Sequence, residues 1–430
     1  MRRSGSPFGA PSERCQSDSA MKSYVPLNVV LVCALLALLH SDPSQSTPRC
    51  DGTLLRSEIS ERQEATLAVV RAKKYAALQR RMDRFLAAYV VGKITDEELF
   101  YEFGAFDRWG PWLTPILQEW VERYPRSFAA HHAMSLHVSS IGWQIRGSAL
   151  ARATSTQQMS EFTERLRSAR GWSLRSIPLH TKPILAYQQL MANAKAITFD
   201  VRLTASSTAV QATKLAEIPR PDVVPILQES IRIQPDNTIV RNAYVWVLAP
   251  RWGGSFEALR EYAKPSTHSD LPADRRASVS YEATMQIASD FWFLERLDEA
   301  VSTYEMASRI CRLNGPFISI GQIRLEQRRF EDALRAGDAA LALVPGSAEA
   351  NRVRAPALRG LGRHAEAVAL LRNLTSEGWP DVQYLLGEYY LTGTGGVTVD
   401  RAEARRLFGI AAKTGYEPAL KRLQSLAGQK

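Results

Sequence analysis

The residues best able to do chemistry in this sequence are three nearby histidines, His131, His132 and His137. Imidazole is a common metal ligand, but ligands on one face of a helix should stand three or four residues apart. Here the gaps are one, five and six residues, and no Asp or Glu lies between the histidines. The cluster therefore favours ordinary helix histidines, and we assign no metal ligand.

A second candidate is the run Arg251, Trp252, Gly253, Gly254 and Ser255, which follows a proline. A Gly-Gly-Ser turn at a helix N-terminus could bind an anion, because free backbone N–H groups point outward there. Neither a P-loop lysine nor a complete glycine-rich fingerprint accompanies it. The run therefore favours a tight turn, with Trp252 packed on neighbouring helices and Ser255 capping the next helix.

The remaining chemistry-bearing residues form no catalytic constellation. Cys311 has neither a basic cluster nor a Cys-x-x-Cys partner nearby, which argues against a reactive thiol. We find no paired nucleophile and base, no catalytic residue and no cofactor-binding residue. The sequence thus predicts a protein that is not an enzyme and needs no cofactor.

Composition agrees with a folded protein that binds no nucleic acid. The 430 residues suffice for two or three domains or for one long solenoid, with 45% hydrophobic and 23% charged residues. The net charge is +10, but the basic residues are spread among acids along helical segments. Without a basic cluster, a solvated surface is favoured over a nucleic-acid interface.

The first 46 residues resemble an export signal. Lys22 precedes an apolar segment at residues 24–39, and small residues follow it. This segment is short for a membrane span, so we expect cleavage near Ser46 and an exported, periplasmic protein. The alternative is an inner-membrane protein anchored by the uncleaved segment. Translation starts at Met1 or at Met21.

Two cysteines, Cys50 and Cys311, would remain after cleavage. An exported protein could pair them, but their spacing in the sequence does not show whether they meet. The pairing is therefore left open.

Nearly all of the chain after this leader has helical periodicity. Residues 57–91 predict one long helix ended by Gly92, and Thr95 with Glu98 predicts a capping box for the next. No segment alternates with period two, which excludes a sheet. We interpret residues 55–265 as an N-terminal α-helical domain.

An internal repeat follows this domain. An acidic residue followed by alanine recurs four times, and the alanines are 33, 34 and 37 residues apart. Such a period predicts stacked helical hairpins that cannot bury their apolar faces singly. The four pairs are Glu299-Ala300, Asp332-Ala333, Glu366-Ala367 and Glu403-Ala404.

Residues 278–376 resemble tetratricopeptide repeats, in which small, apolar and aromatic residues recur at fixed positions. The positions matched include Ile287, Ala288, Phe291, Ala300, Tyr304 and Ala307, then Ile320, Gly321, Ala333, Ala340 and Pro345, then Ala355, Gly362 and Ala367. Two departures are Gly337, at a usual aromatic position, and Pro356, inside an expected helix.

Residues 380–422 resemble a Sel1-like repeat, a helical hairpin with a glycine-rich turn. The match rests on Leu386, Gly387, Tyr390, Gly393, Gly395, Val397, Asp400, Ala404, Phe408, Ala411, Ala412, Gly415 and Ala419. Gly396 lengthens the turn, and Asp400 is expected to cap the second helix.

The N-terminal half resembles an uncharacterised bacterial domain family that has no assigned activity. The similarity covers about residues 60–265 and rests mainly on the hexapeptide at residues 250–255, with Trp120, Pro125, Trp143 and Arg146 as weaker matches. This resemblance implies a helical architecture and no reaction.

Together these features predict an all-α fold, a helical-hairpin solenoid with an N-terminal α-helical domain. Concave solenoid surfaces bind peptides and partner domains, so we expect a protein or peptide partner in the bacterial cell envelope. The residues predicted to contact it are Phe291, Gln322, Leu325, Arg329 and Arg354. The alternative is a cell-envelope enzyme with its site in residues 55–265 and the repeats as support.

Overall fold

The computed structural model describes residues 50, 56–108, 110–147, 154–196 and 221–428. Among these residues every regular element is a helix and none is a strand. The first ten α-helices are α2 (Arg56–Arg71), α3 (Tyr75–Val90), α4 (Asp96–Phe103), α5 (Leu113–Arg123), α6 (Phe128–Arg146), α7 (Thr156–Ser176), α8 (Ile184–Ala194), α9 (Val224–Ile233), α10 (Ile239–Leu248) and α11 (Phe256–Ala263). The others are α12 (Ala273–Phe293), α13 (Leu297–Ile310), α14 (Gly315–Glu326), α15 (Phe330–Leu343), α16 (Ala348–Gly360), α17 (His364–Leu374), α18 (Pro380–Thr392), α19 (Arg401–Lys413) and α20 (Glu417–Ala427).

The expected leader at residues 1–46 lies outside the described residues, so the export signal and its cleavage stay predictions. None of the helices described is both long and apolar enough to span a bilayer.

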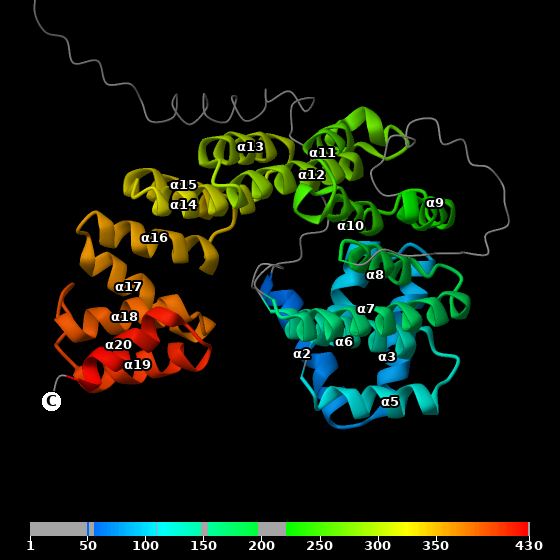
Figure 1. Cartoon of the computed structure of the whole chain (residues 1–430), viewed down its shortest axis with the longest axis horizontal. Helices are drawn as coiled ribbons and strands as arrows, with labels where there is room; N and C mark the ends of the chain where they lie inside the picture. The colour runs from blue at the N-terminus through cyan, green and yellow to red at the C-terminus, as the bar shows by residue number, and fades with distance from the viewer. Residues whose placement is uncertain (1–49, 51–55, 109, 148–153, 197–220, 429–430) are drawn as a thin grey trace, which may run out of the picture. The chain divides into compact units, whose positions relative to one another are not determined.

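From α12 onward, consecutive helices pair into hairpins (Figure 1). The pairs are α12 with α13, α14 with α15, α16 with α17 and α18 with α19. The repeated alanines Ala300, Ala333, Ala367 and Ala404 all lie in the second helix of a hairpin and are fully buried. Each hairpin also packs on the next one, so the chain is an all-α helical-repeat solenoid, as the sequence predicts.

Small residues let these helices approach closely. A Cβ atom at Gly321 would lie 2.5 Å from Val353 Cγ1, and one at Gly387 would lie 2.7 Å from the Phe408 ring. The capping prediction for Asp400 is confirmed, since its carboxylate accepts hydrogen bonds from the backbone N–H groups of Ala402 and Glu403 at 3.0 and 2.9 Å. The family assignment of this last hairpin stays a prediction.

In the N-terminal half, one predicted helix is wrong. Residues 57–91 form two helices, α2 and α3, because the backbone turns at Lys73 with φ of 50°. No glycine or proline marks this turn, so helical periodicity alone runs through it. The capping box of α4 is confirmed, with Thr95 and Glu98 each accepting the other's backbone N–H.

The apolar core is continuous across the whole N-terminal half and the first two hairpins. One cluster of buried side chains extends from Val70 to Ala336, and separate clusters lie at Ala355–Leu407 and Ala404–Leu426. The expected boundary between residues 265 and 278 therefore does not divide the core.

The structure pairs the two cysteines that the sequence left open. Cys50 and Cys311 form a disulfide with a Cα–Cα distance of 5.7 Å, across 261 positions of sequence. Cys311 follows α13 directly and is fully buried beside Tyr281 and Ala307. This bond ties the start of the described chain to the first hairpin.

Candidate functional site

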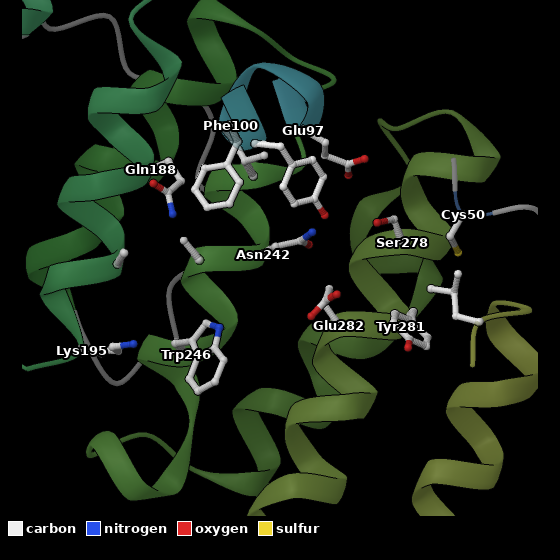
Figure 2. Close-up of a pocket in the computed structure, with 15 residues that line it drawn as sticks. Cys50, Glu97, Phe100, Gln188, Lys195, Asn242, Trp246, Ser278, Tyr281 and Glu282 are labelled. Atoms are coloured by element: carbon white, nitrogen blue, oxygen red, sulfur yellow. The ribbon is translucent and has the colours of Figure 1, made fainter. Parts of the chain in front are cut away.

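A cavity of about 420 Å³ lies between α4, α8, α10 and α12 (Figure 2). Its size falls in the range of small-molecule sites. The lining residues are Cys50, Glu97, Phe100, Tyr101, Gln188, Ala192, Lys195, Ile239, Asn242, Ala243, Trp246, Ser278, Tyr281, Glu282 and Leu313.

One end of the cavity is acidic, with Glu97 from α4 and Glu282 from α12. Burial raises the pKa of Glu282 to about 7, and the negative charge of Glu97 adds to this effect. Burial also raises the pKa of Glu97, although the hydroxyl of Thr238 donates a hydrogen bond to it at 2.7 Å. Glu282 makes no hydrogen bond or ion pair with another residue that the structure describes.

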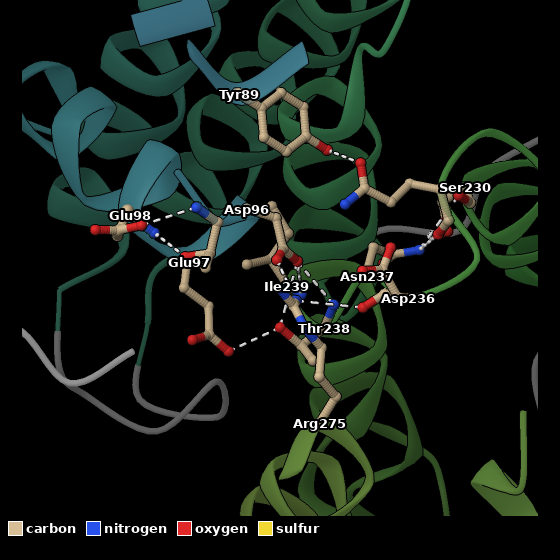
Figure 3. Close-up of polar contacts among 12 residues, drawn as sticks. Tyr89, Asp96, Glu97, Glu98, Ser230, Asp236, Asn237, Thr238, Ile239 and Arg275 are labelled. Carbon is tan, nitrogen blue, oxygen red and sulfur yellow. Dashed lines mark hydrogen bonds and ion pairs between the residues drawn. The ribbon is translucent and has the colours of Figure 1, made fainter. Parts of the chain in front are cut away.

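A polar network holds Glu97 in place (Figure 3). The neighbouring Asp96 is fully buried and accepts the backbone N–H groups of Thr238 and Ile239 at 2.7 and 3.2 Å. It therefore caps α10 from another helix, and Arg275 of α12 pairs with its second oxygen at 2.5 Å. Because Asp96 and Glu97 are adjacent, the bonds to Asp96 also fix the start of α4 beside the cavity.

The other end of the cavity is basic and aromatic. The ammonium nitrogen of Lys195, which follows α8, lies 4.8, 4.7 and 5.7 Å from the ring centres of Trp143, Trp246 and Trp252. Burial lowers the pKa of Lys195 to about 8, helped by the positive charge of Arg251. At neutral pH the group stays mostly charged, held by cation–π contacts.

Between the two ends lie uncharged polar and aromatic groups. The side-chain amides of Gln188 and Asn242 line the cavity, and the oxygen of each is buried without a hydrogen-bond partner in the described structure. Phe100 and Trp246 supply apolar wall, and Trp246 is 40% exposed. An arrangement of charged ends and amide middle suits a ligand that carries opposite charges and peptide-like groups.

The predicted hexapeptide forms a turn beside this basic end. Gly253 has φ of 92°, a Cβ at Gly254 would lie 2.0 Å from the carbonyl oxygen of Leu248, and Ser255 caps α11 as predicted. Arg251 pairs with Asp290 of α12 and donates to Ser289 at 2.9 Å. The turn thus joins α10, α11 and α12.

Trp252 is the residue of this turn that lies beside Lys195. Its ring meets Trp143 edge to face, with ring centres 5.9 Å apart, and it forms part of the aromatic surroundings of Lys195.

The five residues predicted to contact a partner lie on or beside α12, α14, α15 and α16. Phe291 is wrong as an open contact, because it is only 4% exposed and stacks on Phe256 with ring centres 4.6 Å apart. Gln322 and Leu325 lie half-buried on α14. Neither residue lines the cavity.

The two arginines of that set are engaged elsewhere. Arg329 precedes α15 and pairs with Asp332 within the same turn. Arg354 pairs with Asp338 of α15 at 2.7 Å and lies over Gly337, the position where an aromatic residue was expected. The stem of Arg354 therefore fills the space next to this glycine.

The histidines make separate contacts. His132 is buried and stacked on Phe128, and His131 bonds the carbonyl of Ser127 at 2.9 Å. His137 lies 2.7 Å from the hydroxyl of Thr114. In the described part of the chain, no three His, Cys, Asp or Glu side chains are grouped to hold a metal ion.

Sequence reasoning missed Glu97, Lys195 and Glu282. A weak signal existed for Lys195, the one charged residue between positions 183 and 198. A lone charge in an apolar helical segment needs a compensating environment. Glu97 has acidic neighbours at the start of α4, Glu282 lies on α12, and nothing in their spacing distinguishes the two glutamates.

Comparison with protein families gives one match: residues 64–201 fit the family described as "Domain of unknown function (DUF4034)". The match contains α3 to α8 and both Glu97 and Lys195, and it ends before the hexapeptide. No curated protein sequence matches the chain.

Solved structures similar to this chain include helical-repeat proteins. YrrB, titled "a TPR protein with an unusual peptide-binding site", is 17% identical, with 46% of this chain covering 97% of that one and a TM-score of 0.29. Yeast Tom70 is 12% identical over 81% of this chain and 64% of its own, with a TM-score of 0.44. A human IFIT1 dimer with PPP-AAAA is 12% identical over 88% and 86%, with a TM-score of 0.38.

Proposed function

We propose that this chain is a non-catalytic helical-repeat protein that binds a protein or peptide partner in the bacterial cell envelope. The observation that carries the proposal is the cavity between α4, α8, α10 and α12, whose charged ends have no ion-pair partner among the described residues. Buried charges are costly unless they are paired, so such a site is built to receive a polar ligand.

Two features support the cell-envelope part of this proposal. The segment at residues 24–39 has the composition of an export signal, and the Cys50–Cys311 disulfide suits an oxidising compartment. N-terminal sequencing of the exported protein should find an end near Ser46. An intact end at Met1 or Met21 would instead support the anchored alternative.

The partner is tested by affinity purification of the full chain from cell-envelope extract after mild crosslinking. We expect a reproducible partner with the wild type and at least fivefold less of it with the double variant Lys195→Met/Glu282→Gln. A matched control is Lys413→Met/Glu331→Gln, since both residues are exposed on the hairpins. Equal thermal unfolding of the variants would show that the loss is not misfolding.

Gln322 and Leu325 test the second predicted contact surface. The variant Gln322→Ala/Leu325→Ala should weaken capture if the partner also lies on α14, and should leave it unchanged if the cavity suffices.

A second candidate function is catalysis in the same cavity, with the repeats as support. It is favoured by the pKa of Glu282, near 7, and that of Lys195, near 8, because general acids and bases work best near the ambient pH. Its test is release of soluble fragments from purified cell wall. Turnover that Glu282→Gln abolishes, together with no reproducible partner, would replace the binding proposal.

A further inference from the structure

We infer that the cavity binds a short zwitterionic peptide, with the ligand's ammonium group at Glu97 and Glu282 and its free carboxylate at Lys195. The inference rests on the proposed function in taking a peptide as the ligand, and it adds which part of the peptide is recognised.

At the acidic end, no described cation forms an ion pair with Glu97 or Glu282. Arg275 is the nearby basic residue, and it is bound to Asp96 and to the carbonyl oxygen of Asp236 at 3.2 Å. Glu97 and Glu282 therefore face the cavity as two carboxylates that repel each other, with the hydroxyl of Ser278 beside them (Figure 2). A primary ammonium, with three N–H donors and one positive charge, matches this set of acceptors.

The basic end has no ion-pair partner among the residues that the structure describes. The contacts of Lys195 within the described part of the chain are with aromatic rings, and the neighbouring Arg146 lies over Trp143 and Trp252 at 5.7 and 5.6 Å. Asp107 is the one acid whose charge acts on Lys195, but the two form no ion pair among the bonds of the described residues. A ligand carboxylate would meet a charged, partly dehydrated ammonium here, where charge-assisted bonds are strong.

The two ends are separate sites. The charges that act on Lys195 are those of Arg251, Arg146 and Asp107, and neither cavity glutamate is among them. The charge that acts on Glu282 is that of Glu97. A ligand that satisfies both ends must therefore span the cavity.

The middle of the cavity suits a peptide group. The amides of Gln188 and Asn242 offer both donors and acceptors, and side-chain amides of this kind pair well with a ligand amide. The indole of Trp246 and the ring of Phe100 provide apolar wall for small side chains. The volume of about 420 Å³ limits the ligand to a few residues.

The experiment is titration calorimetry of the full chain with alanyl-alanine, its N-acetyl derivative and its C-terminal amide, and with trialanine to vary the length. We expect one of the two free peptides to bind at least tenfold more tightly than either blocked form. Equal binding of the free and blocked peptides, or binding of none, would overturn the inference.

Two variants assign the ends. Glu282→Gln should remove the preference for the free amine over the acetylated peptide, and Lys195→Met should remove the preference for the free carboxylate over the amide. Each variant should keep the preference at the other end, which also shows that its cavity is folded. Glu331→Gln, on the surface of α15, should change neither preference. Two variants that weaken both preferences equally would contradict the assignment of the ends.

The two proposals can fail separately. A protein partner that is captured although no dipeptide binds would support the proposed function and overturn this inference. Binding of a free peptide with preferences for both its free amine and its free carboxylate, but without a captured partner, would support this inference and overturn the proposed function.

Discussion

Different kinds of polar contact stabilise the two halves of the molecule. In the hairpins, many ion pairs join residues three positions apart, such as Arg363 with Glu366 and Arg406 with Glu403. In the N-terminal half and its junction with α12, buried acids pair with partners far away in sequence, such as Asp96 with Arg275. Local periodicity thus builds the repeats, whereas the cavity depends on contacts that join distant segments.

The largest expected effect comes from breaking that long-range network. Asp96→Asn should destabilise the protein by about 3–5 kcal/mol, because it leaves Arg275 without a charged partner in a mostly buried position. Urea unfolding at pH 7 measures the loss. The control Glu366→Gln removes an exposed ion pair and should cost nothing measurable. Equal losses of stability for the two variants would contradict the proposed difference between the halves.

Removing the disulfide should have the next largest effect. Cys50→Ser/Cys311→Ser should lower the free energy of unfolding by about 2–5 kcal/mol, because the bond restricts a long loop of the unfolded chain. Thermal unfolding with and without reductant measures it. The wild type should lose stability in reductant and the double variant should not. If the thermal stability of the wild type did not change in reductant, the disulfide would be contradicted.

A smaller loss is expected from the turn that adjoins the basic end of the cavity. Gly254→Ala should cost about 1–3 kcal/mol, because the added methyl group overlaps the carbonyl of Leu248 and the backbone must shift. Gly409→Ala on α19 is the matched control, since nothing lies within 4 Å of its added Cβ. The control should be neutral or slightly stabilising, as alanine favours helix. Urea unfolding compares both variants.

A further effect, of similar size, depends on pH. Glu282 has its pKa raised from 4.5 to about 7, so the folded state binds this proton more tightly than the unfolded state does. The wild type should therefore lose stability as pH rises from about 4.5 to about 7 through this group. Glu282→Gln should remove that loss and stabilise the protein by about 1–3 kcal/mol above pH 7. If the free energies of unfolding of wild type and variant changed in parallel with pH, the raised pKa of Glu282 would be contradicted.

Sequence alone predicts the repeats well, because their rules are local. The buried alanines at positions 300, 333, 367 and 404 recur at a visible period, and Ser255 and Asp400 cap the helices that follow them. The turn at Lys73 was missed because it uses neither glycine nor proline.

The cavity could not be predicted in the same way. Glu97, Lys195 and Glu282 come to line one cavity only through the packing of α4, α8, α10 and α12, and apart from the lone charge of Lys195 nothing in the sequence distinguishes them. Phe291 was misplaced for a related reason. Periodicity shows that one or two of three consecutive aromatics must be buried, but the choice of Phe291 depends on Phe256 from another helix. Phe293 is the exposed one, at 51%.

The division of the apolar core has a consequence for the order in which parts of the protein unfold. The side chains from Val70 to Ala336 form one cluster, whereas the last hairpins have small clusters of their own. Solenoids of weakly coupled units lose cooperativity and fray from an end. Backbone amides of α18 to α20 should therefore exchange with solvent before those of α10 and α12, and a protease should shorten the chain from its C-terminal end. The cavity should remain intact after this proteolysis.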